Sequence, residues 1–154
     1  MNFKVFISHS VAPRELGVVY AMANEAAKRG ASPFVPDREW EPKGVIPERI
    51  RSHLKETDYL LAIATSSGFQ LDWLNREVRE GLREAKPILV VVDKGIRVPS
   101  NTNRIWINRT NPVKTIQMVS THLAEFGRDK KTKEFLTWIG IGGLFFLLLL
   151  EKEK

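Results

Sequence analysis

Hydroxyl and imidazole side chains gather where two apolar runs of the sequence end. Ser8, His9 and Ser10 follow the first run, and Ser66 lies in a Thr-Ser-Ser triplet that follows the third. Hydroxyls donate and accept hydrogen bonds, and a histidine can contact a phosphate or a ribose. Serines more commonly cap helices or close turns, and a histidine at a strand end often bonds local groups. Both interpretations, a ligand site and a set of turn residues, remain open at this point.

A carboxylate and an aromatic ring occur four residues apart in a segment with helical periodicity. Trp73 precedes Glu77 by one helical turn, so the two side chains lie on the same side of a helix. A carboxylate stabilises a cation, and a neighbouring ring gives the same ligand a flat surface. The alternative for Glu77 is an exposed helix glutamate beside Arg76, Arg79 and Arg83, and the alternative for Trp73 is packing.

Other features limit the kind of site. Trp40 lies in a polar loop, 36–43, and such loops often move and carry function. The chain has no cysteine, and His53 and His122 lie far from His9 in the sequence, so we expect no metal site. The basic residues are scattered instead of forming one run with aromatics, so we do not expect nucleic-acid binding.

The elements that must position these residues follow an α/β pattern, because apolar β-rich runs alternate with segments of helical periodicity. We expect strands at 4–8, 32–35, 59–64, 87–92 and 105–107. Five strands with helices between them predict a flavodoxin-like doubly wound parallel sheet, followed by a C-terminal hydrophobic helix. Ligands bind to such sheets at the carboxyl ends of the strands, between the first and third strands. Ser8 and Ser66 lie at those two ends.

Apolar positions at three- or four-residue spacing predict the faces by which helices pack on the sheet. They are Leu16, Val19, Tyr20, Ala23 and Ala27 in the first helix, Ile46, Ile50 and Leu54 in the second, Leu74, Val78 and Leu82 in the third, and Val113, Ile116, Val119, Leu123 and Phe126 in the last. These sets complete the expected domain at about residue 127.

The C-terminal part of the chain is unlike the rest. The whole chain has 154 residues, which suits one domain, and 24 basic against 18 acidic residues give a net charge of +6. Residues 135–150 include no charged residue and form about 24 Å of helix, against about 30 Å of bilayer hydrocarbon. We expect a transmembrane helix here, between a basic juxtamembrane linker (128–134) and a charged tail (151–154). The basic linker predicts a single-pass membrane protein whose N-terminal domain, 1–127, is cytoplasmic. The alternative is a buried core helix.

Five motifs in order resemble those of a Toll/interleukin receptor (TIR) domain. They are FISHS (6–10), Pro-Lys-Gly (42–44), IPERIRSHLKETD (46–58), YLLAIATSS (59–67) and WLNRE (73–77). The resemblance covers residues 1 to about 126, and the last motif corresponds to the WxxxE pattern of TIR domains that cleave NAD+. Leu71 stands where those domains often have a serine, two residues before the tryptophan.

The resemblance implies that Glu77 is the catalytic carboxylate of an NAD+ glycohydrolase or cyclase, with NAD+ as substrate and no cofactor. The candidate substrate-binding residues are Ser8, His9, Ser10, Trp40, Ser66 and Trp73. It also implies self-association, in which loop 40–44 of one copy completes the site of a neighbour, and a prokaryotic antiphage-type immune role. The tail is a further candidate for self-association. One alternative is a non-catalytic module that recruits other TIR proteins at a membrane, and another is a nucleoside deoxyribosyltransferase-like enzyme.

Overall fold

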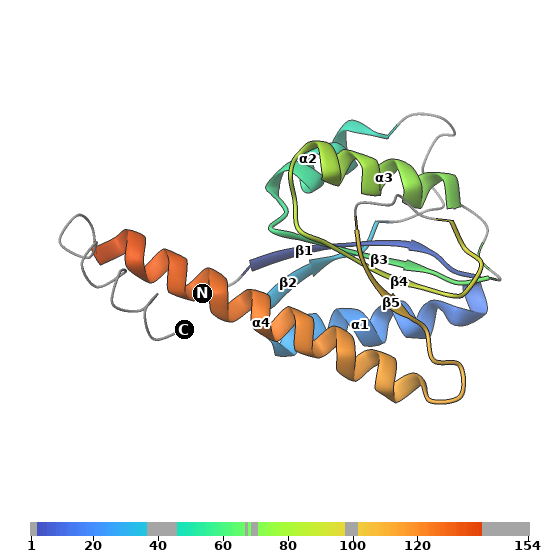
Figure 1. Ribbon diagram of the computed structural model, residues 1–154. Helices are drawn as coiled ribbons and strands as arrows, with labels where there is room; N and C mark the ends of the chain where they lie inside the picture. The colour runs from blue at the N-terminus through green and yellow to red at the C-terminus, as the bar shows by residue number, and fades with distance from the viewer. Residues whose placement is uncertain (1–2, 37–45, 67, 69–70, 98–101, 140–154) are drawn as a thin grey trace.

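The computed structural model describes residues 3–36, 46–66, 68, 71–97 and 102–139, with side chains as far as residue 129. Strands and helices alternate along the described chain (Figure 1). The elements are β1 (Phe3–Ser10), the short 3-10 helix η1 (Pro13–Glu15), α1 (Leu16–Lys28), β2 (Ala31–Phe34), α2 (Glu48–Glu56), β3 (Tyr59–Ala64), α3 (Leu71–Arg83), β4 (Ile88–Val92), β5 (Asn103–Trp106) and α4 (Pro112–Ile139).

All five strands form one parallel sheet in the order β2-β1-β3-β4-β5, so the predicted doubly wound architecture is confirmed. The residues of β3 and β4 are buried along both strands, because helices cover both faces of the sheet. The strand order reverses between β1 and β3. This is the position at which sheets of this order bind their ligands, beyond the carboxyl ends of the strands.

Helices cover the sheet in two layers, with α1 and α4 on one face and α2 and α3 on the other (Figure 1). Each layer closes its own apolar cluster. Side chains alternate along a strand, so Ile7 packs in the cluster under α1 and α4, whereas its neighbour Phe6 packs in the cluster under α2 and α3. The position of a β1 residue in this alternation therefore decides which helices its side chain meets.

Of the five residues predicted for the buried face of α1, Leu16, Val19 and Ala23 pack in the cluster under α1 and α4, and the other two do not. Tyr20 is 57% exposed and Ala27 is also exposed, whereas Met22 and Ala26 are buried beside the correctly predicted Val19. Apolar residues occur all around this helix, so their spacing alone does not decide which stripe meets the sheet.

The first turn of α4 also differs from the prediction. Val113 is 59% exposed, and the inward position of that turn belongs to the buried Thr115. Its hydroxyl oxygen accepts a hydrogen bond of 2.9 Å from the backbone N–H of Asn108, which satisfies a polar group inside the domain. Val119 and Leu123 continue the same face and are buried as predicted.

Helix α4 runs antiparallel to the strands. It begins after β5, and its Phe126 ring meets Phe3 and Tyr59, which start β1 and β3, at ring-centroid distances of 5.2 and 4.9 Å. Beyond these contacts the helix projects away from the sheet (Figure 1) and includes the expected linker, 128–134. Among the described residues, no helix combines the length and apolar character that a membrane span requires. Residues 140–150 of the expected span lie outside the described part of the chain.

Candidate functional site

Glu77 is a fully buried carboxyl group in the middle of α3. Its side chain is 0% exposed, and the Ser8 hydroxyl donates a hydrogen bond of 2.7 Å to its Oε1. An acid inside a protein needs such donors, because an ionised carboxylate is costly to remove from water. Glu77 is therefore not a solvent-exposed helix glutamate, and the fold joins it to a serine near the carboxyl end of β1.

The alternation of β1 divides the expected site residues between the two faces of the sheet. Ser8 and Ser10 occupy positions on the face that α2 and α3 cover. His9 pairs in register with Ile63, which packs in the cluster under α1 and α4, so His9 belongs to the opposite face. The fold brings Ser8 to Glu77 and directs His9 away from it.

Trp73 is mostly enclosed by the domain. Its side chain is 7% exposed, and the Arg76 guanidinium lies over its ring, 5.7 Å from the centroid. This cation–π contact occupies one face of the ring. A ribose that stacked on that face would have to displace Arg76.

Ser66 connects to a polar network that follows the strands. Its backbone N–H donates a hydrogen bond of 2.8 Å to Oδ2 of Asp93, the residue directly after β4. Arg109 donates from Nε to Oδ1 of Asp93 over 2.9 Å, from Nη2 to Oδ2, and from Nη1 to Oε1 of Glu15 over 3.1 Å. These four residues link the segments that follow β1, β3, β4 and β5.

Neither Asp93 nor Arg109 was predicted from the sequence as a site residue. The available signal was an acid directly after the apolar run of β4, at the end of the sheet where sites form. Burial alone raises the pKa of Asp93, but the hydrogen bonds from Arg109 and from the Ser66 N–H outweigh it and hold this pKa below its ordinary value. The network therefore stabilises the ionised form of Asp93.

Asp93→Asn should lower the free energy of unfolding at neutral pH by about 1–3 kcal/mol, because the charged partner of Arg109 is lost. The folded-state pKa of Asp93 is depressed, so its contribution is complete above its unfolded pKa and is lost as pH falls through the folded pKa. Urea unfolding should therefore show a difference between wild type and variant at about pH 7 that shrinks near pH 3.

Asp129→Asn is the matched control, because Asp129 is exposed on α4. Its effect should stay within about 0.5 kcal/mol at both pH values. A destabilisation by Asp93→Asn that is as large near pH 3 as at pH 7 would contradict this account of the network.

Gly68 brings the segment after β3 against the end of β1. A Cβ at this position would lie 1.9 Å from the carbonyl oxygen of Ser10 and 2.9 Å from its Oγ. The Gly68 N–H donates to the carbonyl oxygen of Thr65 over 3.0 Å, and the Thr65 N–H donates to that of Ser10 over 3.1 Å. The close approach requires glycine and fixes the backbone two residues from Ser8.

Two further expectations concern Trp40 and metal binding. Trp40 lies outside the described residues. Within the described ranges, no group of three or more His, Asp or Glu side chains comes together in a way that would hold a metal ion.

A family model and a solved TIR structure agree with this fold. The sequence model of the TIR domain family matches residues 5–123. Among solved structures, the RPS4 and RRS1 TIR domain heterodimer is 10% identical, with a TM-score of 0.58 over 82% of this chain and 99% of that chain. A flavodoxin from the domain Archaea is 12% identical, with a TM-score of 0.49 over 83% of this chain and 99% of that chain. Comparison with curated proteins gave no match. Since the family match spans most of its length, the chain belongs to the TIR domain family.

Proposed function

We propose that this TIR domain cleaves the bond between nicotinamide and ribose in NAD+, with Glu77 as the catalytic carboxylate. The observation that supports this most is a fully buried carboxyl group, held by a β1 hydroxyl near the reversal of the strand order. Acids in such environments are enriched at functional sites, because burial and specific partners perturb their chemistry. TIR domains include NAD+-cleaving enzymes, which agrees with this assignment.

One carboxylate suffices for this reaction because the leaving group is already cationic. When the C1′–N bond of NAD+ breaks, its electron pair goes to the ring nitrogen, and nicotinamide departs neutral without a general acid. The ribose becomes an oxocarbenium-like cation, which Glu77 stabilises electrostatically. Water that adds at C1′ gives ADP-ribose and releases a proton. Attack at C1′ by a ring nitrogen of the same molecule gives a cyclic product instead.

The burial of Glu77 implies that an isolated copy has low activity. A carboxyl group with 0% exposure does not reach a substrate until the residues that cover it rearrange. We propose that self-association provides this rearrangement, with loop 40–44 of one copy placed against its neighbour. NAD+ cleavage then rises with the density of the protein.

Ser8→Ala is expected to reduce NAD+ cleavage by about 10- to 100-fold, because a hydrogen bond to a carboxylate contributes roughly 1.5–3 kcal/mol. Alanine fits the buried strand position, so the fold should persist. The initial rate of nicotinamide release, measured beside thermal unfolding, checks this. Unchanged rates in a folded Ser8→Ala protein would remove Ser8 from the site.

We further propose that residues 135–150 anchor the protein in a membrane and that the TIR domain is cytoplasmic. Helix α4 leads toward the amino ends of the strands, so a bilayer beyond it would face the edge opposite the carboxyl ends. The Ser8–Glu77 pair would then be directed toward the cytoplasm and toward neighbouring copies. Flotation of the full chain with lipid vesicles tests this, and protein that stays in the bottom fraction would contradict it.

An immune effector of the antiphage type is the biological role that we propose for this activity. Product analysis tests the chemistry behind it: the full chain, reconstituted in vesicles, is incubated with NAD+ and the products are separated by chromatography. We expect free nicotinamide in equal amount to the NAD+ lost, together with ADP-ribose or a cyclic product. NAD+ loss without nicotinamide would assign the cleavage to another bond.

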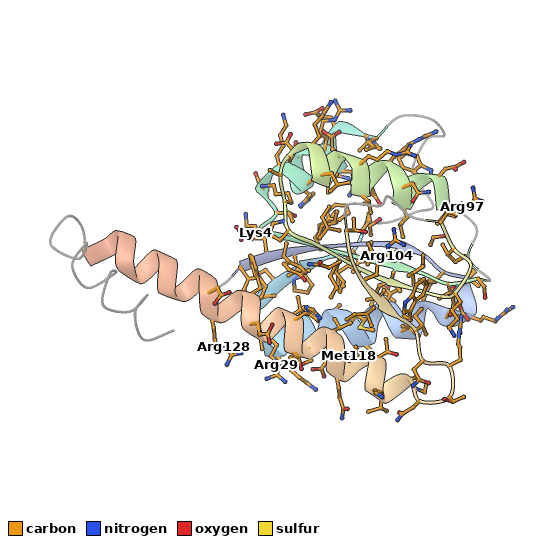
Figure 2. All side chains as sticks on the ribbon, viewed as in Figure 1. Lys4, Arg29, Arg97, Arg104, Met118 and Arg128 are labelled. Atoms are coloured by element: carbon orange, nitrogen blue, oxygen red, sulfur yellow. The ribbon has the colours of Figure 1, made fainter. Side chains whose placement is uncertain are left out.

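A second function, recruitment of other TIR domains without catalysis, is favoured by exposed apolar side chains. Trp106 on β5 is 50% exposed and Met118 on α4 is 43% exposed. Figure 2 labels Met118 on α4. The RPS4 and RRS1 structure is itself a heterodimer of two TIR domains. In this function the wild-type protein binds other TIR domains but releases no nicotinamide at any density, so measuring binding and nicotinamide release together separates the two functions.

A further inference from the structure

A pocket of about 700 Å³ lies at the edge of the sheet, between β5, the segment after β4 and the first turns of α4. Arg104 and Met118, which both line it, come from β5 and α4 respectively (Figure 2). Its volume is in the range of small-molecule sites. Of the predicted site residues, Ser66 lines this pocket but Trp73 and Glu77 do not, so the pocket does not include the proposed catalytic carboxylate.

The lining of this edge pocket favours an anion. Among the residues that the structure describes, the lining includes four basic side chains, Lys94, Arg104, Arg109 and Lys114, and one acid, Asp93. Arg109 already engages that acid through two of its nitrogens. Lys94 and Lys114 are exposed and form no ion pair within the described part of the chain, so their charges are available to a ligand.

Three backbone N–H groups at or beside this pocket, those of Asn108, Thr110 and Asn111, already have hydrogen-bond acceptors. The Asn108 side-chain oxygen already accepts from the N–H groups of Thr110 and Asn111 over 3.1 and 3.0 Å. The Asn108 N–H in turn donates to the Thr115 hydroxyl. An anion would therefore be held by the lysine ammonium groups, which suit phosphate oxygens.

An aromatic ring stands beside these charges. Trp106 lines the pocket and is 50% exposed at the end of the edge strand β5, whereas its neighbour Ile105 is buried. An exposed tryptophan offers a flat apolar face on which a nucleobase can stack. We propose that the edge pocket binds a nucleotide, with its phosphates at Lys94 and Lys114 and its base on Trp106.

ATP binding by the full chain, measured by tryptophan fluorescence and calorimetry, tests this proposal. All proteins in these titrations also carry Glu77→Gln, so that NAD+ is not consumed in the parallel titrations. The double variant Lys94→Gln, Lys114→Gln should weaken ATP binding about tenfold or more. Trp106→Leu should bring the affinity for ATP close to that for inorganic pyrophosphate. The double variant Lys28→Gln, Lys55→Gln removes the same charge outside the pocket and should leave the affinity unchanged.

Titrations with NAD+, ADP-ribose and ATP identify which nucleotide the pocket prefers. An affinity for any of these nucleotides that depends on Lys94 and Lys114 supports the proposal. Three results would overturn it: no nucleotide binding, equal binding by both double variants, or pyrophosphate binding as tight as ATP. Loss of self-association in the pocket variant without nucleotide binding would instead assign the pocket to a second copy. Because these titrations require no turnover, they stand whether or not NAD+ is cleaved.

Discussion

Glu77→Gln is expected to abolish NAD+ cleavage, with a loss on the order of 10³-fold. Glutamine has nearly the same size and can still accept the Ser8 hydrogen bond, so the buried environment of the side chain is retained. The change removes the negative charge that stabilises the ribose cation. Nicotinamide release at saturating NAD+ measures the loss, and unchanged thermal unfolding shows that the fold is intact.

Glu84→Gln is the matched control for this prediction. Glu84 directly follows α3 and is partly exposed, so the same chemical change there should leave the rate of nicotinamide release within about twofold. Equal losses in the two variants would point to a general effect of charge and would remove Glu77 from the mechanism. Residual cleavage near the wild-type rate in Glu77→Gln would do the same.

Gly68→Ala is expected to damage both stability and activity. The new Cβ would meet the backbone of Ser10 at 1.9 Å from the carbonyl oxygen and 2.5 Å from the carbonyl carbon, and backbone atoms cannot rotate away as a side chain can. Either the segment after β3 or the end of β1 must move, at a cost of about 1–3 kcal/mol. Because Ser8 lies two residues before Ser10, the displacement should also lower nicotinamide release by about 10²-fold.

Gly17→Ala separates the steric effect from the loss of a glycine as such. Gly17 lies in α1, and a Cβ there would have nothing within 4 Å. Alanine should be neutral or stabilise the helix by up to about 1 kcal/mol. Thermal unfolding and nicotinamide release, measured for both variants, check the pair. A Gly68→Ala protein as stable and active as Gly17→Ala would show that the close approach to Ser10 does not matter.

The sheet was predictable because its inner strands, β1, β3 and β4, are buried almost throughout and form long apolar runs. YLLAIA at 59–64 was predicted with its observed bounds, and the other strands were placed within a few residues of theirs. The buried faces of the helices were harder to predict. Helix α1 has apolar residues on several sides, and its Tyr20 is exposed. The burial of Thr115 was not predictable, because a polar residue is tolerated inside the domain only when it forms a hydrogen bond, here with the backbone of Asn108.

The candidate site was predictable in part. The motif that includes Glu77 indicated a carboxylate near the first strand, and the structure brings it to Ser8. Alternation along β1 places Ser8 and His9 on opposite faces, but residue order alone does not show which of these faces meets α3 and Glu77. The link between Asp93 and Arg109 joins segments after two different strands, which only the folded chain brings together.

The most direct test of the central claim is the rate of nicotinamide release per molecule, measured for the full chain on vesicles over a range of surface densities. If burial of Glu77 keeps isolated copies inactive, the rate per molecule of the wild-type protein should rise with density, and that of Glu77→Gln should stay at background throughout. No nicotinamide at any density from folded, assembled wild-type protein would contradict the account and favour the recruitment function.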